Sequence, residues 1–385
     1  MTKNVVVLGG GPAGLATAHK LLKRTLPNVA DLKVTLVSPS THLFWVPAGV
    51  RGVIPGEFAD DVLFKPFQPG FSKYTAAQFE FVEGTATGLD PANNAVQVEA
   101  RGKGIQTLNY DHLVIATGSR ASAPGLPYKT LGSHQETLDK WHDLQSKVEA
   151  AKSIVIAGGG ATGIETAGEI AFKYGSKKEI TLVNSADVLL KGLLPSVSKT
   201  AEDSLRKLGV KVVNGATVTT PFENNGAVNG VTLSNGETIA ADLYLPLIGV
   251  RPNTQFVPKE FHDKAKGDGS LAQENTLRVA GTKNVWAVGD VGRLETKQVA
   301  RVGPQIAHLW KNLDAILRGN EAGVTDYKSS EKPMIFVTTG KKTGTGQIGG
   351  FKVFGWIVAM AKGKTLFTDK VQGLVDGEYL TMTSL

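Results

Sequence analysis

The sequence contains no cysteine among its 385 residues. This absence excludes structural disulfides, thiolate nucleophiles and a Cys-x-x-Cys relay, so redox chemistry would have to take place on a bound cofactor. Long apolar runs are also missing. The longest strongly apolar run near the C-terminus, Phe354–Ala361, is far shorter than the ~18 residues that span a bilayer. We therefore expect no membrane-spanning helix.

We expect no targeting signal at the N-terminus. Met1–Asn4 leads directly into the apolar Val5–Leu8, which leaves no room for a charged region, a long apolar region and a cleavage site. Thr2 stands where N-myristoylation requires glycine, so we expect no lipid anchor of this kind. These features predict a cytoplasmic protein.

Charge of either sign is not concentrated anywhere. The chain has 42 Lys and Arg against 35 Asp and Glu, a net charge of +7, and the basic residues are spread along it. General solubility is the favoured interpretation, and no specific nucleic-acid partner is predicted. The length suits two or three domains.

An internal repeat organises the chain. The first copy, Val5–Ala18, reads VVVLGGGPAGLATA, and the second, Ile154–Ala167, reads IVIAGGGATGIETA. Each copy combines a β-branched run, a glycine cluster and an alanine-rich helical stretch, which is typical of the opening of a βαβ unit. A second strand follows at crossover distance in each copy, over Lys33–Val37 and Glu179–Asn184, so the repeats predict two parallel sheets.

The glycines of each repeat match a dinucleotide-binding motif. The motif requires glycine for the tight turn after the strand, for close approach of the backbone to a pyrophosphate, and for packing of the helix on the strand. Helix N-terminal amides then face the phosphates. One such motif is weak evidence, but two copies in matching context predict two dinucleotide sites. The glycines, in chain order, are Gly9, Gly11 and Gly14 in the first copy and Gly158, Gly160 and Gly163 in the second.

Both units lack the acid that usually follows about 20 residues later and binds a ribose hydroxyl. Ser38 ends the second strand of the first unit, and Asn184 ends that of the second. Asn184 pairs with a 2′-hydroxyl less strongly than a carboxylate does, and it does not repel a 2′-phosphate. We predict that Asn184 belongs to the second site. We also predict that the kinetic preference for NADH over NADPH, or the reverse, is less than roughly a hundredfold.

Composition and pattern also predict the domain organisation. Gly, Pro and Ser cluster around Ser119–Pro127, a buried strand ending in an acid returns at Asn284–Asp290, and the composition changes near Tyr327. We predict an α/β fold with two Rossmann-like domains, the second inserted in the first, and a small C-terminal α+β region. The predicted boundaries are 1–124 with 250–326, then 125–249, then 327–385.

These patterns together resemble the two-dinucleotide-binding-domain flavoproteins. Within them the chain is similar nearly end to end to the apoptosis-inducing-factor-like branch that includes the ferroptosis suppressor family, and more distantly to type II NADH dehydrogenases. The residues that carry the resemblance are the first glycine cluster, the strand ending Ala116-Thr117-Gly118, Gly249-x-Arg251-Pro252-Asn253, Thr282–Asp290 and the C-terminal block Gly344–Phe351 with Ala361-Lys362 and Leu366-Phe367.

The resemblance implies FAD in the first domain and NADH or NADPH in the second. By position, it implies that Asp290 binds the ribityl chain of FAD, that Arg51 contacts FAD, and that Ala86 offers backbone to the adenine end. Ser38 departs from the family's usual acid, so the adenine ribose of FAD is expected to be held less firmly. The other FAD contacts that it implies come from the first glycine cluster and the strand end: Gly9, Gly10, Gly11, Pro12, Ala13, Gly14 and Gly118.

Two charged residues are expected near the reacting rings. In the resemblance, Glu165 orients the nicotinamide or flavin edge, and Lys362 lies near the flavin. Each also has an ordinary interpretation: an acid in the first turn of a helix favours the macrodipole, and Lys362 could be a solvated lysine in a basic run. His308 on the helix expected within Lys297–Trp310 is interpreted as packed or solvated. No metal site is predicted.

The expected activity is hydride transfer from NAD(P)H to FAD, followed by reduction of a quinone-like acceptor without a cysteine relay. Two alternatives stay open: a flavin-dependent monooxygenase and a slow NADH-binding redox sensor. Aromatic residues and lysines alternate over Lys352–Lys364, which suits either peripheral contact with a membrane or a buried flap over the flavin. The oligomeric state is not predicted.

Overall fold

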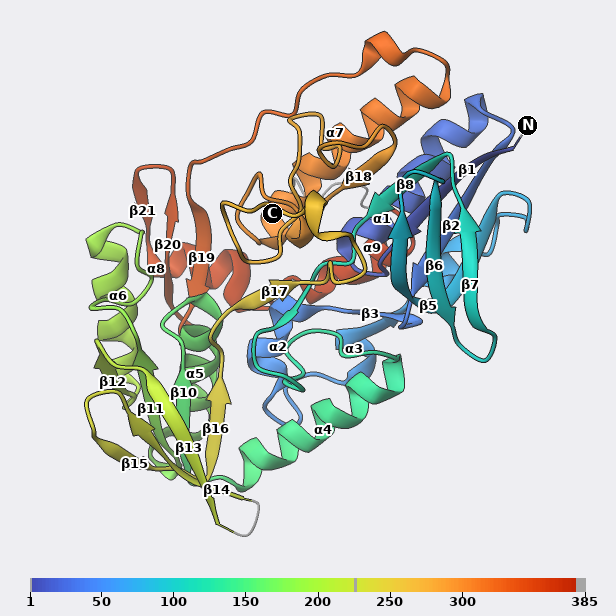
Figure 1. The fold of residues 1–385 in the computed structure, drawn as a ribbon. Helices are drawn as coiled ribbons and strands as arrows, with labels where there is room; N and C mark the ends of the chain where they lie inside the picture. Colours follow the sequence, from blue (N-terminus) through green and yellow to red (C-terminus); the bar gives the residue numbers. More distant parts are fainter. Residues whose placement is uncertain (1, 225–226, 379–385) are drawn as a thin grey trace.

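The computed structural model describes residues 2–224 and 227–378, and its largest element is a seven-stranded sheet (Figure 1). Five of its strands are parallel, in the order β18-β8-β1-β2-β5, and β6 and β7 extend it in antiparallel fashion. Val5–Leu8 is buried throughout, as expected for a parallel strand covered on both faces. The strands are β1 (Lys3–Leu8), β2 (Leu32–Ser38), β5 (Phe79–Asp90), β6 (Ala95–Ala100), β7 (Gly104–Asn109), β8 (His112–Ile115) and β18 (Val285–Ala287).

A second, smaller parallel sheet has the order β12-β11-β10-β16. A three-stranded antiparallel sheet, β13-β14-β15, packs on it through the small core that contains Val155, Val183 and Val231. All strands of this unit come from one continuous stretch of chain, whereas the first sheet takes β18 from far along the sequence. The strands are β10 (Ser153–Ala157), β11 (Glu179–Asn184), β12 (Lys211–Asn214), β13 (Val218–Asn224), β14 (Ala227–Leu233), β15 (Thr238–Ala240) and β16 (Leu243–Pro246).

The helices cover these sheets and bridge them. The long α4 begins at Ser133, whose side chain accepts a hydrogen bond from the Glu136 amide, a standard N-cap. Short strand pairs, β3 (His42–Phe44) with β4 (Phe64–Pro66) and β9 (Ser119–Ala121) with β17 (Val250–Pro252), lie in the connections. The helices are α1 (Pro12–Lys20), α2 (Val46–Gly52), α3 (Asp60–Leu63), α4 (His134–Ala150), α5 (Ala161–Tyr174), α6 (Pro195–Lys207), α7 (Val299–Leu317), α8 (Gly355–Val358) and α9 (Val371–Val375).

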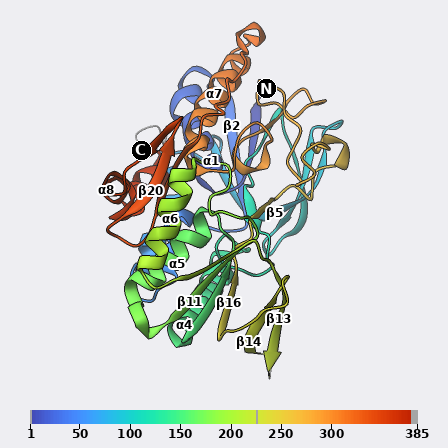
Figure 2. The ribbon, with the colours of Figure 1, turned by 90° about the vertical axis from the view of Figure 1, so that its left-hand side faces the viewer.

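The C-terminal region touches both units. Its antiparallel sheet places β20 beside α6 and β19 beside α5, on the side that Figure 2 turns toward the viewer. The chain then forms α8 and a π-helical turn over Ala359–Gly363, and α9 packs against α1 of the first unit. The strands of this region are β19 (Met334–Thr338), β20 (Gly344–Ile348) and β21 (Phe351–Val353).

The predicted fold class is confirmed: an α/β protein with two Rossmann-like domains, the second inserted in the first, and a small C-terminal α+β region. The expected second strands coincide with β2 and β11. The domain boundaries themselves stay a prediction. None of the helices in residues 2–224 and 227–378 combines the length and apolar character needed to span a bilayer.

Candidate functional site

A cavity of about 1620 Å³ lies where the two parallel sheets and the C-terminal region meet. Its wall includes Leu8 and Ser38 at the carboxyl ends of β1 and β2, and Ala157 and Asn184 at the ends of β10 and β11. Ligands of open parallel sheets bind at this edge of the strands. A pocket for one drug-sized ligand measures roughly 300–1,000 Å³, so this cavity has room for two ligands.

The first glycine of each repeat forms a strained turn that only glycine adopts easily. Gly9 has φ +119° and Gly158 has φ +126°. A Cβ at these positions would lie 2.3 Å from the carbonyl oxygen of Ala116 or 2.2 Å from that of Leu247. The two loops therefore lie in tight contact with the neighbouring strand end, in the same way in both units.

The second glycine of each repeat faces open space. A Cβ on Gly11 or Gly160 would have no atom of the described chain within 4 Å, and both residues line the cavity. Neither α1 nor α5 has a side-chain N-cap among the described residues. First-turn amides are thus left to bind an anion at each helix N-terminus.

The third glycine of each repeat lets the helix approach the loop. A Cβ on Gly14 would lie 1.8 Å from the carbonyl oxygen of Gly9, and one on Gly163 would lie 2.0 Å from that of Gly158. The close contact is thus with the first glycine of the loop, where the sequence led us to expect contact with the strand. Neither residue lines the cavity.

Asp290 follows β18 and lines the cavity beside the first loop. Its Oδ2 accepts hydrogen bonds from Ser119 Oγ at 2.6 Å and from Lys129 Nζ at 3.2 Å. These contacts hold the carboxylate at the cavity wall, where it can accept from a ligand hydroxyl. Ala86 and Gly118 also line the cavity. Their predicted contacts with FAD, and that of Asp290, stay predictions.

The Asn184 amide is engaged within the protein. Its Nδ2 donates to the carbonyl oxygens of Ala186 and Val188 and to Asn214 Oδ1, at 2.9–3.0 Å. The side chain packs over Gly159, where a Cβ would lie 2.3 Å from Asn184 Oδ1. Asn184 therefore braces the loop after β11. Its predicted contribution to nucleotide preference stays a prediction.

Glu165 and Lys362 form an ion pair at the cavity wall. Lys362 Nζ lies 2.5 Å from Glu165 Oε1, and it also donates to the Phe336 carbonyl at 3.1 Å. The same Glu165 oxygen accepts from the Thr338 amide at 2.8 Å. Both side chains are largely buried, and both residues line the cavity. The resemblance therefore pointed to two residues that the fold brings together from positions 165 and 362, although their roles stay predictions.

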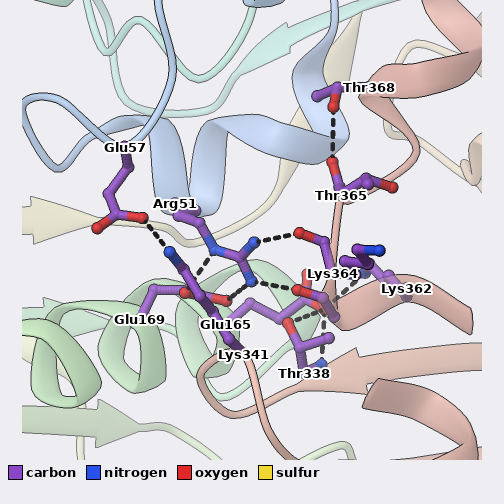
Figure 3. A network of polar contacts seen from close by, with 11 residues as sticks. Arg51, Glu57, Glu165, Glu169, Thr338, Lys341, Lys362, Lys364, Thr365 and Thr368 are labelled. Carbon is purple, nitrogen blue, oxygen red and sulfur yellow. Dashed lines mark hydrogen bonds and ion pairs between the residues drawn. The ribbon is translucent and has the colours of Figure 1, made fainter. Parts of the chain in front are cut away.

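Arg51 does not line the cavity, although its neighbour Val50 does. Its guanidinium turns to Glu169 on α5, with two bonds of 2.8 Å, and donates to two main-chain carbonyls near the C-terminus (Figure 3). Burial raises the pKa of the Glu169 carboxyl, and the bonds from Arg51 oppose that shift. The predicted contact of Arg51 with FAD stays a prediction that this pairing does not support.

The helix expected after Asp290 is α7. Gln298, Val299 and Ala300 at its N-terminus line the cavity, so the positive end of its dipole faces the site. His308 lies farther along α7, where its Nε2 is 2.8 Å from the Thr325 carbonyl. It is a packed residue outside the cavity lining, as interpreted from the sequence.

The residues present fit FAD and a nicotinamide dinucleotide. Two anion-binding loops open into one cavity with room for both ligands, as two pyrophosphates require. Within the described chain, no group of three or more potential metal ligands gathers. The cavity wall carries the carboxylates Glu165 and Asp290 and a larger set of basic side chains, which complements anionic ligands. The basic side chains are Arg120, Lys129, Lys191, Lys297 and Lys362.

Several site residues were not found from the sequence. Ser119 and Lys129 hold Asp290 from the stretch between β8 and α4, and nothing in the local sequence pattern marks them. Glu169 does carry a signal, because an acid four residues after Glu165 lies on the same face of the helix.

The model of the pyridine nucleotide-disulphide oxidoreductase family matches residues 3–307. The chain is 41% identical over 379 residues to oxidoreductase ptaL of Pestalotiopsis fici, covering 98% of this chain and 100% of that protein. It is 30% identical to ferroptosis suppressor protein 1 of Xenopus tropicalis, covering 95% and 94% of the two chains. The resemblance inferred from the sequence is confirmed.

Solved structures share the fold. The sulfide:quinone oxidoreductase of Aquifex aeolicus superposes with a TM-score of 0.77 at 19% identity, covering 98% of this chain and 92% of that one. NDH2 of Plasmodium falciparum in complex with NADH gives a TM-score of 0.74 at 13% identity, covering 99% and 96%.

Proposed function

Because the chain belongs to the pyridine nucleotide-disulphide oxidoreductase family, we propose that it passes electrons from NAD(P)H through FAD to a quinone-like acceptor. It is an oxidoreductase that uses FAD and NADH or NADPH as cofactors. The observation that carries the proposal is the opening of two equivalent glycine loops into one cavity, with the Glu165–Lys362 pair at its wall.

The first unit holds FAD and the second holds the nicotinamide dinucleotide. The loops from Gly9 and Gly158 offer backbone amides to the two pyrophosphates, and Asp290 accepts from a hydroxyl of the FAD chain. FAD, when bound, supplies the ability to take a hydride and release electrons to a second substrate. The chain contributes the placement of the two ligands.

Lys362 provides a positive charge at the cavity wall, where reduction adds negative charge. Glu165 and the Phe336 carbonyl fix the direction of its ammonium group. A held cation of this kind stabilises developing charge better than a mobile one, because it needs no reorganisation. Glu165 therefore acts on the reaction through Lys362 and through the local field.

The acceptor is proposed to be a quinone because protein thiols are absent. The 385 residues contain no cysteine, so the chain has no thiols that could form the disulphide relay that the family name describes. A quinone takes two electrons and two protons directly. The sulfide:quinone oxidoreductase that shares the fold is named for the same class of acceptor.

One experiment tests this function. The purified protein is scanned for a flavin spectrum, titrated with NADH and NADPH without oxygen, and then mixed with a soluble quinone. We expect bleaching by either nucleotide and rapid return of colour with the quinone. Lys362→Met should slow the second step, and Lys364→Met is the matched control, since Lys364 contributes a main-chain carbonyl to the network described above.

Other outcomes would contradict the proposal in distinct ways. A protein that stays colourless after incubation with FAD is not an enzyme of this kind. Transfer of oxygen to a substrate would favour the monooxygenase. Reduced flavin that persists for minutes beside the quinone would favour the redox sensor.

We further propose that the C-terminal region docks on a lipid membrane. Four large apolar side chains between the start of β21 and the turn after α8 are exposed: Phe351 (82%), Phe354 (65%), Trp356 (66%) and Met360 (71%). In the chain, these residues lie between Ile348 and Ala361, which both line the cavity wall. A lipid-soluble quinone would reach the site from this side.

Charge on the same region suits anionic lipid headgroups. Lys342 and Lys364 are exposed near the apolar surface, and lysines beside exposed aromatic side chains are typical of interfacial segments. Flotation with phosphatidylcholine vesicles, with and without phosphatidylserine, tests this. Phe354→Ser with Trp356→Ser should abolish flotation, whereas Ile105→Ser, at an exposed isoleucine of β7, should not. Equal flotation of both variants would contradict the proposal.

A further inference from the structure

The Arg51 side chain joins three parts of the molecule. It extends from α2 of the first unit to Glu169 on α5 of the second, with Nε and one terminal nitrogen each 2.8 Å from a carboxylate oxygen. Its terminal nitrogens also donate to the carbonyls of Gly363, at 2.7 Å, and Lys364, at 3.1 Å. Arg51 and Glu169 are each only 1% exposed.

The carbonyls that Arg51 holds are adjacent to Lys362. Gly363 directly follows Lys362, and it is buried so tightly that a Cβ there would lie 2.8 Å from the Lys341 carbonyl. In Figure 3 the Arg51 guanidinium points toward the main-chain oxygens of this segment, and Lys341 lies close by. The main chain after Lys362 is therefore fixed between two neighbours.

The acids on α5 form the other half of this arrangement. Glu165 and Glu169 are one helical turn apart and point in the same general direction. Glu165 pairs with the Lys362 ammonium at the cavity wall. Glu169, one turn farther along α5, pairs with the Arg51 guanidinium. The same helix thus anchors both the side chain of Lys362 and, through Arg51, the main chain that carries it.

We propose that Arg51 and Glu169 are positioning residues, which hold the Gly363-Lys364 main chain so that Lys362 meets Glu165 at the cavity wall. The proposal deepens the proposed function and rests on it for the kinetic consequence. Stability alone does not explain the pair, because a buried ion pair can often be replaced by packed apolar residues without loss of stability. An apolar pair would, however, leave the two carbonyls without their forked donor.

Two variants separate positioning from stability. Arg51→Met combined with Glu169→Leu removes both charges together and leaves no unpaired ion in the interior. Arg51→Lys keeps a cation beside Glu169 but lacks the fork that reaches the carbonyls. Glu57→Gln is the matched control, since Glu57 pairs with the side chains of Lys173 and Lys341, and the substitution leaves in place the Lys341 main-chain carbonyl that borders Gly363.

The first readout does not depend on turnover. The holoprotein is pulsed with acetic anhydride, and the labelling of Lys362 is compared with that of Lys364 by peptide mass spectrometry. Lys362 should be protected in the wild-type protein and in Glu57→Gln. In the double variant and in Arg51→Lys its labelling should rise at least about tenfold, because a displaced side chain leaves its buried pairing with Glu165.

The second readout is kinetic. We expect the double variant to keep a urea midpoint close to that of the wild type. Its kcat with a quinone should nevertheless fall about tenfold or more, since a misplacement of about 1 Å can cost that much. KM for NAD(P)H should stay within about twofold, because the glycine loop of the second unit is untouched. If the pair had only a structural role, the double variant would change the urea midpoint and leave kcat and KM unchanged.

The outcomes distinguish the two proposals. Unchanged Lys362 labelling in a folded double variant, or unchanged kcat, would overturn the positioning role. If the double variant does not fold, Arg51→Lys decides the question by the same two readouts. If the wild-type protein does not reduce a quinone, the proposed function fails, and the labelling still decides whether Arg51 and Glu169 place Lys362.

Discussion

The two glycine-rich units are nearly identical in their loops and different in their helices. In both, the first glycine has φ near +120°, the second faces open space and the third touches the carbonyl of the first. The helices then diverge, because α5 carries Glu165 and Glu169 where α1 carries Ala16 and Lys20. The geometry of the loop is thus the duplicated property, and the two acids whose partners lie on or contact the C-terminal region belong to the second helix alone.

The units also differ in how they hold the C-terminal region. α5 holds it with the ion pair of Glu165 and Lys362, whereas Glu169 acts only through Arg51 of α2, which donates to the Gly363 and Lys364 carbonyls. α1 holds it with a neutral histidine, because His19 Nε2 lies 2.8 Å from the Val375 carbonyl while the ring stacks on Phe71. Just after α1, Lys23 adds a charged contact, because its Nζ donates to the carbonyls of Asp376 and Gly377.

The largest expected effect tests the equivalence of the loops. Gly11→Ala should raise the Kd for FAD by roughly a hundredfold, so that FAD is released. Gly160→Ala should raise KM for NAD(P)H by roughly a hundredfold while FAD stays bound. In both variants the new methyl group occupies the space of a pyrophosphate. Spectra and steady-state kinetics measure both effects.

The control for these variants is stability. Neither methyl group meets an atom of the described chain within 4 Å, so the free energy of unfolding should change by less than about 0.5 kcal/mol. Equal loss of both cofactors in either variant would show that the two loops do not act separately.

The next effect tests the divergence of the helices. Glu165→Ala gives α5 the residue that α1 has in the same place. We expect kcat with a quinone to fall about ten- to fiftyfold, because Lys362 loses its partner, and KM for NAD(P)H to change by less than about threefold. Stopped-flow mixing with NADH and then with a quinone would locate the affected step. A rise in KM without a fall in kcat would assign Glu165 to nucleotide binding instead.

Acid should loosen the attachment of α1. Burial lowers the pKa of His19 to about 4, and the hydrogen bond from its ring to Val375 only partly offsets this. Because the unfolded chain then takes up a proton more readily, stability is present above pH 6.5 and is lost as the pH falls toward 4. His19 alone should cost about 2 kcal/mol between pH 7 and pH 5.

Urea unfolding at several pH values measures this loss. His42, which also has its pKa lowered to about 4 by burial, contributes to the total, so the difference between the wild type and His19→Gln isolates His19. Identical pH slopes for the two proteins would contradict the prediction.

The smallest effect concerns the residue that ends the second strand of each unit. Asn184→Ser gives the second unit the residue that the first has in Ser38. The free energy of unfolding should fall by about 1 kcal/mol, since the three hydrogen bonds of the amide are lost. The ratio of kcat/KM for NADH and NADPH should move by less than about threefold. A tenfold shift would mean that Asn184 reads the ribose directly.

The sequence predicted what is local and repeated. The two loops follow from glycines at fixed spacing, and the parallel sheets follow from the apolar runs before and after them. Lys362 and Glu165 were found only through the resemblance, because no local pattern relates positions so far apart. Arg51 was predicted to face FAD, yet the direction of its guanidinium is set by Glu169, which packing alone brings near.

The remaining differences have the same origin. Asn184 was predicted to face a ribose. In the structure its side-chain amide donates hydrogen bonds to Ala186, Val188 and Asn214. Lys129, which supports Asp290, lies between β9 and α4 in a stretch without a periodic pattern. Contacts between distant segments depend on the tertiary fold, so a motif shows which residues are available and leaves their partners open.

The strand β18 has a consequence for the order in which the protein assembles during synthesis. The inserted unit takes β10 to β16 from one continuous stretch, so it can complete its parallel sheet while the ribosome is still translating. The first sheet has to wait for Val285–Ala287 to add its edge strand. The segment that carries Lys362 emerges later still, so its ion pair with Glu165 closes only after both nucleotide-binding units exist.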